Sequence, residues 1–188
     1  MTPFIRRHGS VVGIFEQNEA QLLANLAAQV VELLRDRNGE SESSADPLAA
    51  MVGMNGPVLP PEDPVLARLL PDAYVDDPED AAEFRRYTEQ TLTSSKVANA
   101  ESLIGTLTEG GMGAGDEVDV EVELDEAQTL AWLRAFTDVR IALAVRLGIE
   151  DDEDAERLAA DDDPGIAAMA DVYDWLGFVQ ETLVQAAE

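Results

Sequence analysis

EVDVEVELDEAQTLAWLRAFTDVRIALAVRLG, residues 117–148, is the stretch that decides the fold of this chain. Residues 117–124 alternate valine or leucine with acidic residues, which predicts a strand with one buried and one solvated face. Asp125 follows as a helix cap, and Gln128 stands at the position of its capping-box partner. Residues 126–148 are apolar on nearly every side, and this pattern predicts the central buried helix of a domain.

The N-terminal residues predict a β-hairpin that this strand can join. Residues 3–7 and 10–15 are rich in Phe, Ile and Val, and His8-Gly9 between them suits a tight turn because glycine accepts a positive φ. A lone strand is unstable in water, so we expect the strand at 117–124 to pair with the hairpin.

The other helices are marked by their start and stop signals. Apolar residues at steps of three and four predict a helix from Glu16 to about Arg37, which Asn38-Gly39 should end. Three further helices should begin at Asp-Pro pairs, in which the acid caps and proline opens the first turn, namely Asp63-Pro64, Asp77-Pro78 and Asp163-Pro164. The second of these should turn Phe84 and Leu92 inward.

The expected fold class is therefore mainly α, in one domain over residues 1–188. About five helices should surround the central one, with a small antiparallel sheet made by the hairpin and the later strand. Glycine, proline and serine predict flexible loops at about 39–62 and 109–116, and in the first of these we expect at most one weak helical turn near Pro47.

Charge is the strongest compositional signal. The 188 residues hold 39 Asp and Glu against 12 Lys and Arg, a formal net charge of −27. This charge repels phosphate backbones and anionic membrane surfaces, so DNA binding is not favoured. It serves either as a solubility device or as an acidic face for a basic protein partner.

Several kinds of chemistry are excluded or fail their motif. The chain has no cysteine and a single histidine, His8, which excludes disulfides, thiolate zinc sites and multi-histidine metal sites. GGMGAG at 110–115 does not fit a phosphate-binding loop, and a calcium loop from Asp152 would need glycine where Arg157 stands. We expect no catalytic residue, no cofactor and no metal. With no apolar run of about 18 residues and no signal peptide, we expect a cytoplasmic protein.

Two groups of charged residues are candidate sites. Arg6 and Arg7 at the hairpin tip, and Arg85 and Arg86 near a helix start, could contact an anion or an acidic partner, or lie solvated beside acidic neighbours. Arg134, Asp138 and Arg140 lie within the most apolar helix, where charges should be paired, and we expect structural ion pairs there. The simplest of these joins Arg134 to Asp138, four residues apart.

The last helix carries apolar residues at heptad spacing over about three heptads. The seam consists of Ile166, Met169, Tyr173, Leu176 and Leu183, with Gln180 at one position. Packing within the chain and a homodimer interface explain this spacing equally well. Because Trp175 and Phe178 add apolar surface beside the seam, we expect a homodimer built on this helix.

Four groups of residues resemble a known family. They are LLPDAY, DD, AAEFRR and TE within 69–89, WL, DVRIAL and RL within 132–147, the hairpin with Leu33-Leu34, and YDWL at 173–176. They resemble an actinobacterial family that was long labelled a domain of unknown function, is encoded beside the Clp adaptor ClpS, and is named for the oxidative-stress transcriptional regulator AosR.

The resemblance implies a small cytoplasmic, non-enzymatic regulator that acts through a protein partner, such as a sigma factor or a Clp-associated protein. Redox sensing in that regulator depends on paired cysteines, and this chain has none, so no redox-switch residue is carried over. The alternatives are an autonomous DNA-binding transcription factor and an enzyme with an unrecognised carboxylate site. No predicted helix carries the arginines of a recognition helix.

Overall fold

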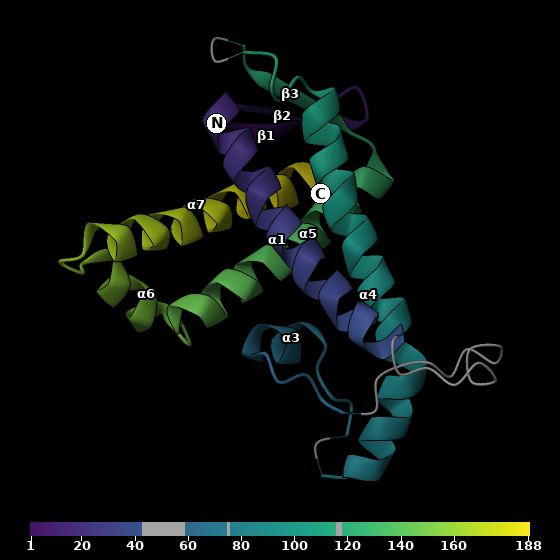
Figure 1. Cartoon of the computed structure of the whole chain (residues 1–188). Coiled ribbons are helices and arrows are strands. Elements are labelled where there is room, and N and C mark those ends of the chain that lie inside the picture. Colours follow the sequence, from purple (N-terminus) through teal and green to yellow (C-terminus); the bar gives the residue numbers. More distant parts are fainter. Residues whose placement is uncertain (43–58, 75, 116–117) are drawn as a thin grey trace.

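The computed structural model describes residues 1–42, 59–74, 76–115 and 118–188, and for 38–42 it describes the backbone alone. Within these ranges the chain is mainly helical, with one small sheet (Figure 1). The elements in chain order are β1 (Thr2–Arg7), β2 (Ser10–Phe15), α1 (Gln17–Glu42), α3 (Pro64–Leu69), α4 (Pro78–Glu109), β3 (Val120–Leu124), α5 (Glu126–Leu147), α6 (Asp152–Ala159) and α7 (Pro164–Ala187).

The sheet has the expected antiparallel order, β1-β2-β3, with β2 in the centre. His8 and Gly9 turn the hairpin with φ values of 53° and 98°, as a two-residue turn with two left-handed positions requires. Val120, Val122 and Leu124 point into the core, whereas Val118 precedes the strand and is exposed. The Val118 carbonyl accepts a hydrogen bond from Gln17 Nε2 at 2.7 Å, so its backbone is bound to the start of α1.

The core is centred on α5, which contacts the sheet and the helices α1, α3, α4 and α7. Trp132 of α5 is 0% exposed and lies 5.8 Å from Phe4 and 6.0 Å from Phe15, measured between ring centroids. Its indole Nε1 donates a 2.8 Å hydrogen bond to Thr106 Oγ1 of α4. The expectation of a central helix is thus confirmed, although Leu130 and Arg134 on its outer side are exposed.

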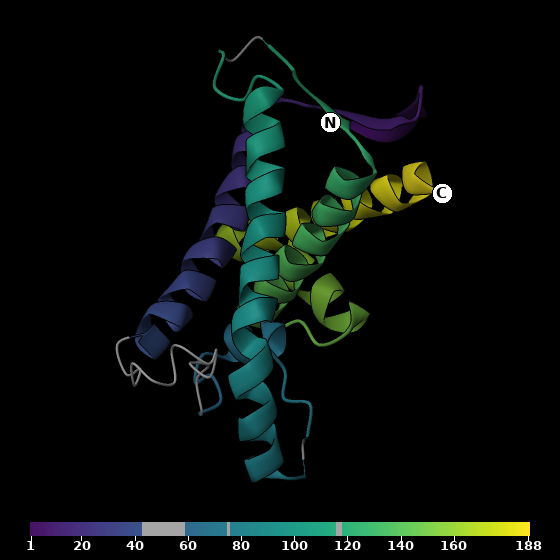
Figure 2. The same ribbon diagram turned by 90° about the vertical axis from the view of Figure 1, so that its right-hand side faces the viewer.

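The long helices α1 and α4 pack against each other, and Arg37 near the end of α1 pairs with Glu89 of α4. The first part of α4 extends beyond the other elements in both views, and α5 packs against both α4 and α7 (Figures 1 and 2). Both termini lie close to the sheet, because α7 packs against β1.

Helix starts follow the sequence signals closely. Asp63, Asp77 and Asp163 each accept hydrogen bonds from the first turn of the helix that follows, and Asp125 forms the expected capping box with Gln128. α6 was not expected. Asp151 caps it, none of its residues is buried, and its apolar residues Ala155, Leu158 and Ala159 form a run too short to predict a helix by its period.

Two helix expectations were wrong. α1 continues past Asn38-Gly39 to Glu42, since the contact of α1 with α4 offsets the cost of about 1 kcal/mol for a glycine within a helix. In α4 the expected inward residues Phe84 and Leu92 are exposed, and the buried positions of the first half are taken by Arg85, Glu89 and Thr93.

The structure describes only the ends of the first expected loop, whereas it describes most of the second. Residues 39–42 belong to α1, and the rest of the first loop as far as residue 58, with the expected turn near Pro47, lies outside the described residues. The glycine-rich loop after α4 is bound by Gln17, whose side chain donates to Gly111 O at 3.0 Å and accepts from Gly113 N at 2.8 Å.

Replacing Trp132 by alanine should lower the free energy of unfolding by about 3–5 kcal/mol, because a large buried side chain and its hydrogen bond are lost. Urea denaturation measures this change. Phe178→Ala, at an exposed aromatic side chain, is the matched control and should change stability by about 0.5 kcal/mol or less. Equal losses in the two variants would contradict the central place of Trp132.

Candidate functional site

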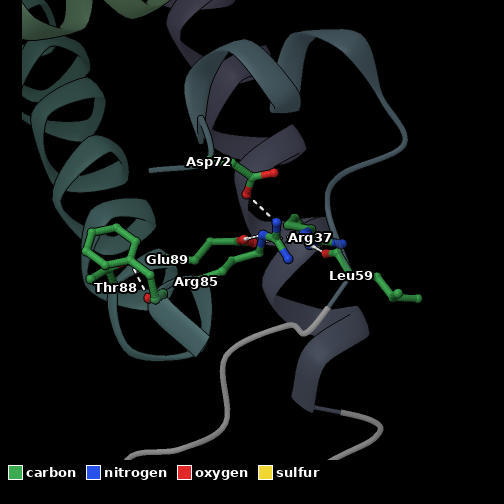
Figure 3. A network of polar contacts seen from close by, with 7 residues as sticks. Arg37, Leu59, Asp72, Arg85, Thr88 and Glu89 are labelled. Atoms are coloured by element: carbon green, nitrogen blue, oxygen red, sulfur yellow. Dashed lines mark hydrogen bonds and ion pairs between the residues drawn. The ribbon is translucent and has the colours of Figure 1, made fainter. Parts of the chain in front are cut away.

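Four charged side chains form a cluster between α1, α4 and the segment after α3, in which Arg37, Arg85 and Glu89 are buried and Asp72 is exposed at the edge (Figure 3). Arg37 Nε donates to Glu89 Oε1 at 2.9 Å, and Arg37 Nη2 donates to the carbonyl of Leu59 at 2.6 Å. Arg85 forms an ion pair with Asp72, and its Nε lies 3.8 Å from Glu89 Oε2. We call Arg37, Asp72, Arg85 and Glu89 the buried charge cluster.

The buried charge cluster joins three parts of the chain that are distant in sequence. Glu89 is 3% exposed and Arg85 is 6% exposed, so the contacts of Glu89 with the two arginines lie in a region with little water, whereas Asp72 meets solvent. Two cations and two anions balance there, which is the condition for burying charge at tolerable cost. The cluster therefore holds residues 59–72 against the crossing of α1 and α4.

This finding corrects one of the expected contact sites. Arg85 was expected at the surface, either as a contact for an anion or partner or solvated beside acidic neighbours, and it is buried and paired with acidic residues of its own chain. Its neighbour Arg86 is half-buried. Arg6 and Arg7 are both exposed, and Arg6 Nη1 donates to the carbonyl of Ala187 at 3.2 Å. The structure thus does not bring the four arginines together.

Asp138 is buried and paired, but its partner is Lys96 of α4, at 2.5 Å, and not Arg134. Arg134 points to solvent, so the local pair expected from the four-residue spacing is wrong. Burial raises the pKa of Asp138 above its ordinary value of 3.8, although the hydrogen bond and charge of Lys96 act in the opposite direction. Sequence reasoning missed Lys96, because the two residues lie 42 positions apart.

Arg140 joins α5 to α7. Its Nη1 donates to Gln180 Oε1 at 2.9 Å, and its guanidinium lies 5.1 Å from the ring centroid of Tyr173. Gln180 Nε2 in turn donates to Thr137 Oγ1 at 3.0 Å. The expected structural role of Arg140 therefore takes the form of a hydrogen bond and a cation–π contact.

The heptad seam of α7 divides between two environments. Leu176 and Leu183 are each 0% exposed and pack into the core of their own chain, so they are not available to a second copy. Ile166 and Met169 in the first two turns are exposed, and Tyr173 is half-buried. The seam thus reflects packing within the chain in its second half. Nothing in the structure tests the expected homodimer, and of the seam residues only those in the first turns of α7 are exposed to a second copy.

An apolar groove lies between α1 and the pair α5 and α7. Along α1 it is lined by Leu22, Leu26 and Leu33, and the opposite wall includes Ala142 and Met169. Val65 of α3 also lines it, and the hollow has a volume of ≈530 Å³. We call this hollow the α1–α5–α7 groove. Its size lies within the range of ligand-binding clefts.

Acidic side chains border the α1–α5–α7 groove. Glu32 and Asp36 of α1 line it and are exposed, and neither forms an ion pair with any residue in the described part of the chain. The cation of the lining, Arg146, is paired with Asp63 at 2.9 Å. The uncompensated charge at the edge of the groove is therefore negative.

The buried charge cluster yields a stability prediction. Glu89→Gln keeps the shape of the side chain but removes the carboxylate between two buried arginines, and it should cost about 3–5 kcal/mol of unfolding free energy. Glu101→Gln is the matched control, because Glu101 also lies on α4 and pairs with an arginine of α1, Arg35, at the surface. Its cost should be about 1 kcal/mol or less. Similar midpoints of urea denaturation for the two variants would contradict the buried pairing.

Asp138 yields a prediction about pH. Because its folded pKa lies above the ordinary 3.8, the native state retains the proton more readily than the unfolded chain. The stability of the wild type relative to Asp138→Asn should therefore fall as the pH rises from about 4 through the folded pKa, by at most about 1.4 kcal/mol per pH unit. Urea denaturation across that range measures it, with the exposed Asp171→Asn as control. If the free energy of unfolding of the wild type relative to Asp138→Asn instead rose with pH, the burial of Asp138 would be contradicted.

Two local features are absent from the described residues. Among the residues that the structure describes, no group of three or more acidic or histidine side chains is placed to hold a metal ion. None of the described helices combines the length and the apolar character needed to cross a membrane.

Known proteins resemble this chain over nearly its whole length. The oxidative stress regulators AosR of Mycobacterium tuberculosis and Mycobacterium bovis are each 36% identical to it over 184 residues, which cover 89% of this chain and 77% of theirs. A Mycobacterium leprae protein with the same AosR designation is 36% identical over 183 residues, 90% of this chain and 78% of its own. No solved structure matches at a significant level. The family described as "Domain of unknown function (DUF2017)" matches residues 1–187, and the chain belongs to this family.

Proposed function

We propose that this chain is a cytoplasmic, non-enzymatic regulator in the response to oxidative stress and that it acts by binding a protein partner. Its relatives are named as oxidative stress regulators, which supports a regulatory role. The family resemblance favours a partner in the transcription or proteolysis machinery, such as a sigma factor or a Clp-associated protein.

The pairing of basic side chains within the chain favours a protein partner over DNA. Six of its 12 basic side chains are engaged in ion pairs with acidic residues of the same chain, which are Arg35–Glu101, Arg37–Glu89, Arg85–Asp72, Lys96–Asp138, Arg146–Asp63 and Arg157–Asp154. The other six basic side chains, which form no ion pair among the described residues, stand against a net charge of −27. Such a surface repels nucleic acid and attracts a basic protein surface.

Deleting the gene in its own host tests the regulatory role. We expect the deletion to change both survival and the transcript response after peroxide treatment, and the wild-type gene supplied on a plasmid to restore them. An unchanged response in the deletion strain would contradict the proposed function.

Retention of the purified chain on duplex DNA separates a protein-mediated role from direct DNA binding. We expect no retention even at low salt, because condensed phosphate charge and an acidic protein repel each other most strongly there. Retention that weakens steeply as salt is raised would instead assign the function to DNA binding, since that dependence is the signature of phosphate contacts.

A further inference from the structure

We infer that the α1–α5–α7 groove binds one amphipathic helix of a partner protein, with an apolar stripe flanked by lysine or arginine. This inference rests on the proposed function and specifies the partner that the function requires. It is drawn from the shape, the exposed apolar side chains and the charge of the groove.

The first argument is the shape. Leu22, Leu26 and Leu33 recur on one side of α1, and Asp36 continues the same line. From Leu22 to Asp36 this line is about 21 Å long at 1.5 Å per residue, which matches roughly four turns of a bound helix. A wall formed by α5 and α7 faces α1 across the groove, so a helix can lie between them in the helix-in-groove mode.

The second argument is the exposed apolar surface. Leu22 is 36% exposed and Met169 is 38% exposed, one on each wall, and Leu26, Leu33 and Ala142 between them are half-buried. Apolar side chains gathered in one concave place are typical of binding surfaces, whereas isolated ones are common everywhere. A partner helix that presents residues at steps of three and four would remove this surface from water.

The third argument is charge, and it selects the occupant. Glu32 and Asp36 border the groove without an ion pair among the described residues, and Arg146 is already neutralised by Asp63. A second copy of the chain would bring another −27 charge to an acidic edge, so self-association is opposed. A helix with basic flanks would instead gain from the same charges.

The test uses two synthetic peptides of about 18 residues with identical leucine stripes at steps of three and four. In one peptide the other positions are lysine, and in the second they are glutamate. Fluorescence anisotropy should show that the full chain binds the lysine peptide and does not bind the glutamate peptide. The affinity for the lysine peptide should fall as salt rises.

Two variants locate the binding site. Leu22→Glu and Met169→Glu should each weaken the lysine peptide about tenfold, whereas Phe178→Glu, on an exposed residue of α7 outside the groove, should not. All three add one negative charge, which would strengthen a non-specific attraction to the lysine peptide. Loss of binding therefore reports on the apolar groove, and circular dichroism checks that each variant is folded.

Several outcomes would overturn the inference. Equal binding by Leu22→Glu and Phe178→Glu would assign the peptide to the general acidic field. Self-association of the wild type in sedimentation, abolished by Leu22→Glu, would assign the groove to a second copy. Groove-specific peptide binding together with an unchanged peroxide response on deletion would contradict the proposed function alone. An altered response without groove-specific binding would contradict the groove alone.

Discussion

The contact between Trp132 and its neighbours positions the rest of the chain. The indole lies between the sheet, through Phe4 and Phe15, and α4, through the hydrogen bond to Thr106. Because α5 is fixed by this contact at one end, its other faces become the surface on which α3 and α7 pack. The walls of the α1–α5–α7 groove thus depend on a core contact near the other end of the same helix.

Charge is used differently inside and outside the molecule. Inside, the buried charge cluster and the pair of Lys96 with Asp138 hold α4 against its neighbours, and each cation there faces a carboxylate. Outside, acidic residues are in large excess. Under the proposed function, the negative surface that remains would select a basic partner by repelling acidic ones.

The parts of the fold that could be predicted are those with local signals. Asp-Pro helix starts, the His8-Gly9 turn and the valine alternation of β3 each depend on residues close in sequence, and the structure has all three. The apolar residues of α6 form a run too short to predict a helix by its period.

The candidate site was harder to predict, because its pairings are distant in sequence. Arg85 was expected at the surface because charged side chains are rarely buried, and its burial is balanced by Asp72 and by Glu89, which Arg37 of α1 also contacts. The heptad spacing of α7 did not distinguish the buried Leu176 from the exposed Met169, since the same repeat serves a core and an interface. The groove walls come from separate helices, which a single helical pattern does not reveal.

Hydrogen–deuterium exchange of the full chain, with and without the lysine peptide, tests most directly whether the acidic chain recognises a basic helix in this groove. The account predicts slower exchange in α1 between Leu22 and Asp36 and in the first turns of α7, because a bound helix covers both walls. In the first part of α4, which extends beyond the other elements, the peptide should leave the exchange rates unchanged. Slower exchange centred on the acidic residues 149–163, with the groove unchanged, would contradict it.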